Sequence, residues 1–77
     1  MIQNSKGTIV IIGFGWVGQA NALALTQMGY KVFYYDIVPP VLRYEVKYAD
    51  VYSKITPLSN ALEKDGECTW YIVAVGD

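Results

Sequence analysis

Six residues near the start of the chain, Gly13-Phe-Gly-Trp-Val-Gly18, have the spacing G-x-G-x-x-G, and an acidic residue, Asp36, follows 18 positions after the last glycine. Where such a turn leaves a strand and opens a helix, each glycine has a physical role. Gly13 allows the tight turn, Gly15 lets a pyrophosphate approach the backbone, and Gly18 lets the helix pack closely on the sheet. The helix N-terminus, with its unpaired N–H groups and positive dipole end, attracts the anion. The pattern therefore predicts a dinucleotide-binding turn.

Asp36 is predicted at the carboxyl end of the second strand, where a carboxylate can accept hydrogen bonds from the ribose hydroxyls of an adenosine. The same carboxylate would repel a 2′-phosphate, so the sequence predicts NAD rather than NADP as the cofactor. Arg43 could offset this charge, although a solvated charge on a helix is the favoured interpretation of that residue.

The remaining members of the predicted cofactor site surround these residues. Trp16 and Val17 are expected to donate through their backbone amides, and the Trp16 ring either stacks on a nicotinamide or packs against the turn. Phe14 lies within the turn, Ile37 follows the acidic residue, and Val75 ends the last predicted strand. We predict no metal site, because the chain has one cysteine and no histidine. No catalytic residue is assigned within this chain.

The elements that must position this site follow from hydrophobic periodicity. Residues 8–12 form a continuous β-branched run, as expected for a strand covered on both faces. A helix follows, with Val17, Ala20, Ala24 and Met28 as its apolar stripe, and Gly29 is expected to end it. A second strand then covers residues 31–36.

The second half of the chain is less regular. Residues 41–49 are predicted as a helix after Pro39 and Pro40, although the alternation of Tyr44, Val46 and Tyr48 also fits a strand. A short third strand is expected near residues 51–55, a short helix over 57–64, and a last strand over 68–75. This alternation predicts an α/β fold, a partial parallel Rossmann-type sheet of three to four strands with flanking helices.

Composition excludes several classes of function. Apolar residues make up 53% of the 77, and the net charge is -1 with no basic run, so nucleic acid is not an expected partner. No apolar stretch reaches the roughly 18 residues that span a bilayer. Residues 6–22 loosely imitate a secretory signal, but the glycine pattern over the same residues is favoured. The single cysteine, Cys68, fits a cytoplasmic protein and is expected to be buried in a strand.

The segment 8–36 resembles the amino-terminal half of the UDP-glucose/GDP-mannose dehydrogenase family. These proteins open with a strand, G-x-G-[aromatic]-V-G, an Ala/Leu-rich helix, and a Gly before a strand that ends in Asp. Ile72-Val-Ala-Val75 is similar to a later strand of the family. The resemblance implies oxidation of a nucleotide sugar with two NAD per turnover and a catalytic cysteine in a later domain. Cys68 precedes a core strand, so that role is not transferred to it.

Residues 1–77 are accordingly expected to be the N-terminal part of a single dinucleotide-binding domain, without the substrate domain and without turnover of its own. A nucleotide-sugar substrate would bind only through the downstream domain. One alternative is a standalone module that binds NAD(H) or pairs with itself or another chain through an exposed sheet edge, which would make a homo-oligomer. A second is another ligand on the same architecture, such as FAD or S-adenosylmethionine.

Overall fold

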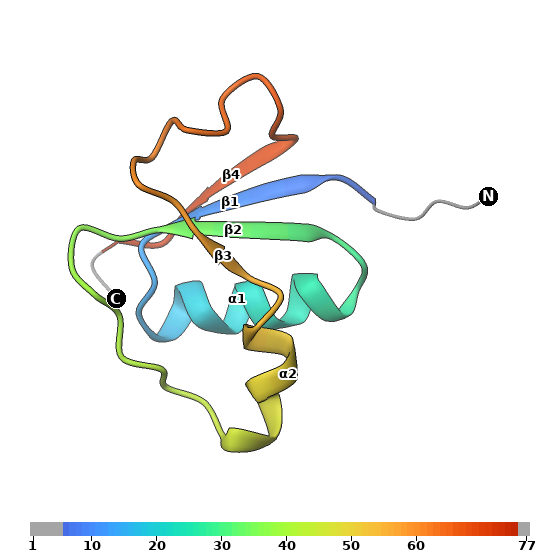
Figure 1. Ribbon diagram of the computed structural model, residues 1–77, viewed down its shortest axis with the longest axis vertical. Coiled ribbons are helices and arrows are strands. Elements are labelled where there is room, and N and C mark those ends of the chain that lie inside the picture. The colour runs from blue at the N-terminus through green and yellow to red at the C-terminus, as the bar shows by residue number, and fades with distance from the viewer. Residues whose placement is uncertain (1–5, 76–77) are drawn as a thin grey trace.

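The computed structural model describes residues 6–75, which form a four-stranded parallel sheet with two helices on one face (Figure 1). Along the chain the elements are β1 (Thr8–Ile12), α1 (Trp16–Gln27), β2 (Lys31–Tyr35), a 3-10 turn (Val46–Tyr48), α2 (Ala49–Tyr52), β3 (Thr56–Pro57) and β4 (Trp70–Val73). The strands lie in the order β3-β2-β1-β4, and every neighbouring pair is parallel. The predicted partial Rossmann-type α/β fold is confirmed.

The strand β1 lies at the centre of the sheet because its side chains are apolar on both faces. Ile9 and Ile11 belong to the cluster that packs beneath α1, whereas Val10, on the opposite face, is also fully buried. A half-exposed strand would alternate polar and apolar residues, so the continuous run correctly predicted a strand covered on both sides.

Helix α1 begins after Gly15 and ends where predicted, because Gly29 adopts the left-handed conformation, with φ of 101°, that glycine tolerates best. Its apolar stripe was predicted wrongly, since Val17, Ala20, Ala24 and Met28 are all exposed. The buried residues of the helix are instead Gly18, Gln19, Ala22 and Leu23. The glycine turn fixes the rotation of the helix about its axis, because Gly18 must face the sheet. Ala22 lies four residues after Gly18, and Leu23 lies four residues after Gln19, so both lie on the same buried face.

The predicted helix over 41–49 is wrong, and so is the predicted strand over 51–55. Residues 39–45 form an irregular strap across the N-terminal half of α1, and only the 3-10 turn and the four-residue α2 are helical. Tertiary hydrogen bonds explain the difference, because the Val41 carbonyl and the Arg43 amide bond to the side chain of Gln19. The third strand begins later than expected and consists of two residues.

The predicted helix over 57–64 is also absent, and residues 58–69 connect β3 to β4 as a series of turns. Glu63 accepts hydrogen bonds from both the amide and the hydroxyl of Ser59, and Asn60 accepts one from the amide of Leu62. Such local side-chain bonds compete with helix formation. The connection must also cross from one edge of the sheet to the other. A non-helical segment spans this width with fewer residues than a helix would need.

The last strand is confirmed over Trp70–Val73, which is shorter than the predicted 68–75. Cys68 therefore precedes the strand. Its thiol is partly exposed and donates a hydrogen bond to the Trp70 carbonyl at 3.1 Å, so the expected burial in a strand is wrong.

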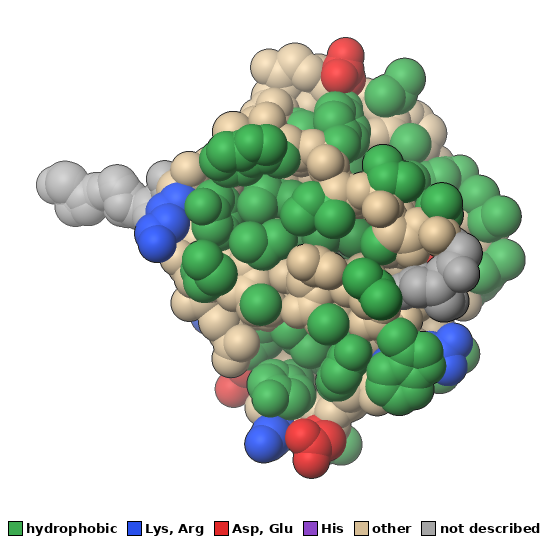
Figure 2. Space-filling model, turned by 180° about the vertical axis from the view of Figure 1, so that it is seen from behind, with side chains coloured by type: hydrophobic (Ala, Val, Ile, Leu, Met, Phe, Trp, Pro, Cys, Tyr) green, Lys and Arg blue, Asp and Glu red, His purple; other side chains and the backbone are tan. Residues whose placement is uncertain are grey.

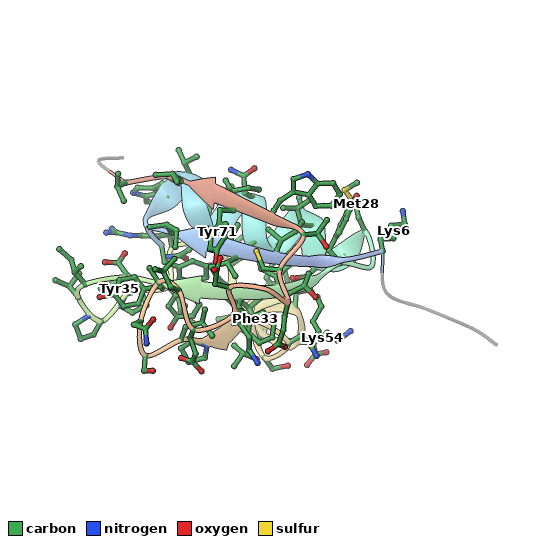
Figure 3. The ribbon with its side chains drawn as sticks, turned by 90° about the horizontal axis from the view of Figure 1, so that it is seen from above. Lys6, Met28, Phe33, Tyr35, Lys54 and Tyr71 are labelled. Atoms are coloured by element: carbon green, nitrogen blue, oxygen red, sulfur yellow. The ribbon has the colours of Figure 1, made fainter. Side chains whose placement is uncertain are left out.

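Among the described residues, the 58–69 connection covers the sheet face opposite α1, and Figure 3 looks onto this face with Phe33, Tyr35 and Tyr71 labelled. Phe33 is buried beneath it, with the Lys64 ammonium 4.9 Å from its ring centre. Tyr71 donates a hydrogen bond to Asp65 Oδ1 at 2.9 Å, which links β4 to the connection.

Tyr71 should make the stability of the fold depend on alkaline pH. Desolvation of the phenol, together with its hydrogen bond to Asp65, raises the pKa of Tyr71 from 10.0 to about 12. Because the raised pKa favours the neutral phenol in the folded state, its stabilising contribution is complete below pH 10 and is lost as the pH rises towards 12. We expect Tyr71→Phe to remove the last tyrosine to ionise in an ultraviolet titration of the folded chain. Loss of a phenol that ionises near pH 10, with the step near pH 12 retained, would contradict the assignment.

Candidate functional site

The carboxyl ends of β1, β2 and β4 meet at one edge of the sheet, together with the N-terminus of α1 (Figure 1). The chain passes from β1 through β2 to β3 in one direction and then returns to place β4 on the other side of β1. Open α/β sheets bind their ligands at this kind of reversal, in the crevice outside the strand ends. The glycine turn, Asp36, Ile37 and Val75 all lie at this edge.

Gly13 follows β1 directly and its amide donates to the Tyr35 carbonyl at 2.8 Å, which continues the β1–β2 ladder by one residue. Its φ is 97°, and a Cβ there would come within 2.9 Å of the Ala74 carbonyl and 3.0 Å of the Val75 amide nitrogen. Both the backbone conformation and the close approach to the end of β4 therefore require glycine at this position.

The other two glycines set the start of α1. Gly15 is the N-cap residue and accepts the first helical hydrogen bond, from the Gln19 amide at 3.0 Å. A Cβ on Gly18 would overlap the Gly13 carbonyl oxygen and would lie 3.3 Å from Cγ2 of Ile11. Gly18 therefore allows the close contact between helix and strand that the sequence predicted for it.

Asp36 lies one residue beyond β2 and is tied to the glycine turn. The Phe14 amide donates to Oδ2 at 2.7 Å, and the Val38 amide donates to Oδ1 at 3.1 Å. An ionised carboxylate offers about four acceptor positions, so roughly two remain for a ligand. The carboxylate can thus hold the turn in place and still accept hydrogen bonds from a pair of hydroxyl groups.

A small pocket of about 80 Å³ opens among the strand ends, and its lining consists of Ile12, Gly13, Tyr35, Asp36, Ile37 and Val75. Ile37 and Val75 are 85% and 66% exposed, although both are aliphatic. Exposed apolar side chains in the same pocket as a carboxylate suit a ligand with a flat apolar ring and a polar sugar. The pocket is smaller than the roughly 300–1,000 Å³ of a typical ligand site. A dinucleotide would therefore lie mainly across the open edge.

The side chains of the other three predicted site residues lie outside this pocket. Phe14 is buried in the core, and its ring stacks on that of Tyr34 with centroids 3.9 Å apart. Trp16 and Val17 are half exposed on the first turn of α1. The Trp16 ring packs edge-on against Tyr44, at 5.4 Å between centroids. None of these three side chains lines the pocket among the strand ends.

Sequence reasoning missed Gln19, which is fully buried and uses all of its amide groups. Its Nε2 donates to the carbonyl oxygens of Phe14 and Val41, both at 2.8 Å. Its Oε1 accepts from the Arg43 amide at 2.8 Å and from the Tyr52 hydroxyl at 2.6 Å. Gln19 therefore joins the glycine turn to the strap and to α2. Its position directly after Gly18, the glycine that faces the sheet, is the signal that could have identified it as a buried polar residue.

Charge at the site comes from few groups. The Arg43 guanidinium lies over the Trp16 ring at 5.5 Å from its centre, and the two ion pairs among residues 6–75 join Lys47 to Glu45 and Lys64 to Glu67. The sequence predicted Arg43 on a helix, but it lies in the irregular strap. It forms no ion pair with Asp36. Burial, followed by the charge of Asp36, raises the pKa of Tyr34, which keeps that phenol neutral beneath the turn.

Over residues 6–75, no group of three or more His, Cys, Asp or Glu side chains could hold a metal ion. The same part of the chain contains no helix with the length and hydropathy needed to cross a membrane. Comparisons with protein-family models, with curated proteins and with solved structures found no match to this chain. The site must therefore be interpreted from its geometry and from the sequence patterns described above.

Proposed function

We propose that this chain is the NAD-binding part of an NAD-dependent oxidoreductase, most similar to a nucleotide-sugar dehydrogenase. The observation that carries the proposal is the convergence of Gly13, Asp36, Ile37 and Val75 on one pocket beside the N-terminus of α1. The resemblance of residues 8–36 to the UDP-glucose/GDP-mannose dehydrogenase family supports the choice of substrate class. A cytoplasmic location belongs to the same proposal.

In this proposal the adenine ring lies between Ile37 and Val75, and the ribose hydroxyls donate to Asp36. The pyrophosphate then lies against the glycine turn, where Gly13 and Gly15 present no side chain and the dipole of α1 is favourable. A 2′-phosphate would come close to the Asp36 carboxylate without a cation paired to it, so NAD is preferred over NADP. The resemblance assigns the catalytic residues to a later domain, so this chain is expected to bind the cofactor without turnover. Sustained NADH production from NAD and UDP-glucose by this chain would contradict that expectation.

The role of Asp36 is tested by Asp36→Asn, which keeps the shape of the side chain and one acceptor oxygen but removes the charge. We expect NADH to bind more weakly by about 1–3 kcal/mol, the range for a lost charge-assisted hydrogen bond. We also expect the preference for NADH over NADPH to narrow, because the repulsion of the 2′-phosphate is gone. Both effects can be measured by fluorescence titration.

Asp50→Asn is the matched control, because Asp50 is an exposed carboxylate on α2 with the same charge. It should leave both affinities unchanged. If Asp36→Asn also bound NADH as tightly as the unmodified chain, Asp36 would serve only to hold the turn through Phe14, and the proposed ribose contact would be wrong.

A further inference from the structure

The peptide groups of the glycine turn are held in fixed directions by two side chains. The Phe14 amide donates to Asp36 Oδ2 at 2.7 Å, and the carbonyl of the same peptide bond, on Gly13, faces Gly18 of α1. The Phe14 carbonyl accepts from Gln19 Nε2 at 2.8 Å. Two consecutive peptide bonds of the turn are thus anchored, the first by Asp36 and the second by Gln19.

The bond to Gln19 determines the direction of the Gly15 amide. The C=O and N–H groups of a trans peptide bond point in opposite directions, and residues 6–75 contain no cis peptide bond. Gln19 is fully buried, so the Phe14 carbonyl that it binds is directed into the core and the Gly15 N–H is directed away from it. No group within residues 6–75 accepts a hydrogen bond from this amide. The Gly15 N–H is therefore a donor directed outwards beside the N-terminus of α1.

The orientation of the Gln19 amide is determined in turn by the strap and by α2. The Arg43 backbone N–H can only donate, and it donates to Oε1 of Gln19 at 2.8 Å, as does the Tyr52 hydroxyl at 2.6 Å. Exchange of the amide oxygen and nitrogen would place Nε2 against the Arg43 N–H and Oε1 against two carbonyl oxygens. Nε2 must therefore face the glycine turn, and the strap holds it there.

Few cationic side chains lie where they could bind a pyrophosphate at the turn. The chain has six lysine and arginine residues, and on the face in Figure 2 the charged side chains lie towards the margins while hydrophobic ones gather over the centre. The Arg43 guanidinium lies over the Trp16 ring on the first turn of α1, whereas Lys6 and Lys31 lie at the amino ends of β1 and β2, away from the site. Binding of an anion at the turn therefore depends strongly on the direction of the backbone amides.

We propose that Gln19 is a positioning residue for the cofactor, because its bond to the Phe14 carbonyl holds the Gly15 amide in the direction in which it can donate to the pyrophosphate. This inference rests on the proposed NAD site and adds to it a residue that does not touch the cofactor. A donor that is already in place costs no reorganisation when the ligand binds. Loss of the Gln19 amide should therefore weaken the part of the affinity that comes from the pyrophosphate and leave the part that comes from the adenosine.

The test compares the dissociation constants of ADP-ribose, which contains the pyrophosphate, and of adenosine, which does not, by NMR titration of the isotope-labelled chain. We expect Gln19→Leu to weaken ADP-ribose roughly tenfold or more, as for a lost hydrogen bond to a charged group, and adenosine by less than about twofold. The ratio of the two constants is informative even in a destabilised variant, because an unfolded fraction weakens both ligands by the same factor. Gln27→Leu, at an exposed position of α1, is the matched control and should leave both constants unchanged.

The same titrations separate this inference from the proposed NAD site. Asp36→Asn should weaken both ligands and leave their ratio unchanged, because both contain the ribose hydroxyls. The Gly15 amide resonance should shift on addition of ADP-ribose but not of adenosine. If the unmodified chain bound neither ligand, the NAD site would be wrong and the role of Gln19 with it. If it bound both, and Gln19→Leu left the ratio of the two constants unchanged, the positioning role alone would be overturned.

Discussion

Gly18→Ala should both destabilise the fold and abolish cofactor binding. The added methyl group would overlap the Gly13 carbonyl oxygen, which is part of the backbone and cannot rotate away. Helix α1 would have to move off β1, which opens the core around Ile11 and displaces the turn. Overpacking of this kind costs about 3 kcal/mol. That is a large part of the roughly 4–12 kcal/mol expected for a domain of this size. Urea unfolding and an NADH titration measure the two effects.

Gly66→Ala is the control for that experiment. Gly66 has a positive φ of 92°, but a Cβ there would have no atom within 4 Å. Alanine at this position should therefore cost only the backbone strain of about 1 kcal/mol, and it should leave NADH binding intact. If Gly18→Ala were no less stable than Gly66→Ala, the close packing of α1 on β1 would be wrong.

Gln19→Leu should cost about 3 kcal/mol of unfolding free energy, because leucine has a similar size but makes none of the four hydrogen bonds of the amide. The carbonyl oxygens of Phe14 and Val41, the Arg43 amide and the Tyr52 hydroxyl would each lose a partner. The strap over residues 39–45 should then detach from α1. Denaturant unfolding measures the first effect, and hydrogen exchange at residues 41–44 measures the second.

Two further variants separate the hydrogen bonds from the effect of any substitution in the helix. Gln27→Leu changes the same residue type at an exposed position of α1 and should have little effect. Gln19→Glu keeps the acceptor that faces Arg43 and Tyr52 but places an oxygen against two carbonyl groups. It should therefore be less destabilised at acid pH, where the protonated carboxyl can donate again. Equal stability of Gln19→Leu and the unmodified chain would show that the network has no structural role.

The sequence predicted those parts of the fold in which one local pattern determines the structure. The apolar runs at residues 8–12 and 31–36 became β1 and β2, and Gly29 ended α1. The rotation of α1 about its axis was predicted wrongly, because small apolar residues occur on two faces of this helix. Periodicity alone does not decide between the face of Ala20 and Ala24 and the face of Ala22 and Leu23. The contact between Gly18 and Gly13 chooses between them, and that contact joins the helix to a strand.

The middle of the chain could not be predicted because its structure depends on distant residues. The strap follows the side chain of Gln19, which lies more than 20 positions earlier in the sequence. The connection between β3 and β4 is set by the width of the sheet that it crosses and by the local bonds of Ser59 and Asn60. Helix propensity in both segments was outweighed by these interactions.

For the candidate site, the sequence predicted which residues lie together at one edge of the sheet, but not all of their contacts. Gly13, Asp36, Ile37 and Val75 line one pocket, as expected for positions at the ends of adjacent strands. The hydrogen bond from the Phe14 amide to Asp36 was not predicted, because it depends on the path of the chain after β2. This contact gives the carboxylate a structural role in addition to the proposed contact with the ribose.

Calorimetric titration of the folded chain with NADH, and in parallel with NADPH, tests the central claim most directly. We expect saturable binding of one NADH per chain, with NADPH weaker by about tenfold or more, which corresponds to about 1.4 kcal/mol. Circular dichroism of the same sample confirms that the chain is folded. Absence of NADH binding to the folded chain, or equal affinity for the two cofactors, would contradict the assignment of this edge of the sheet as an NAD site.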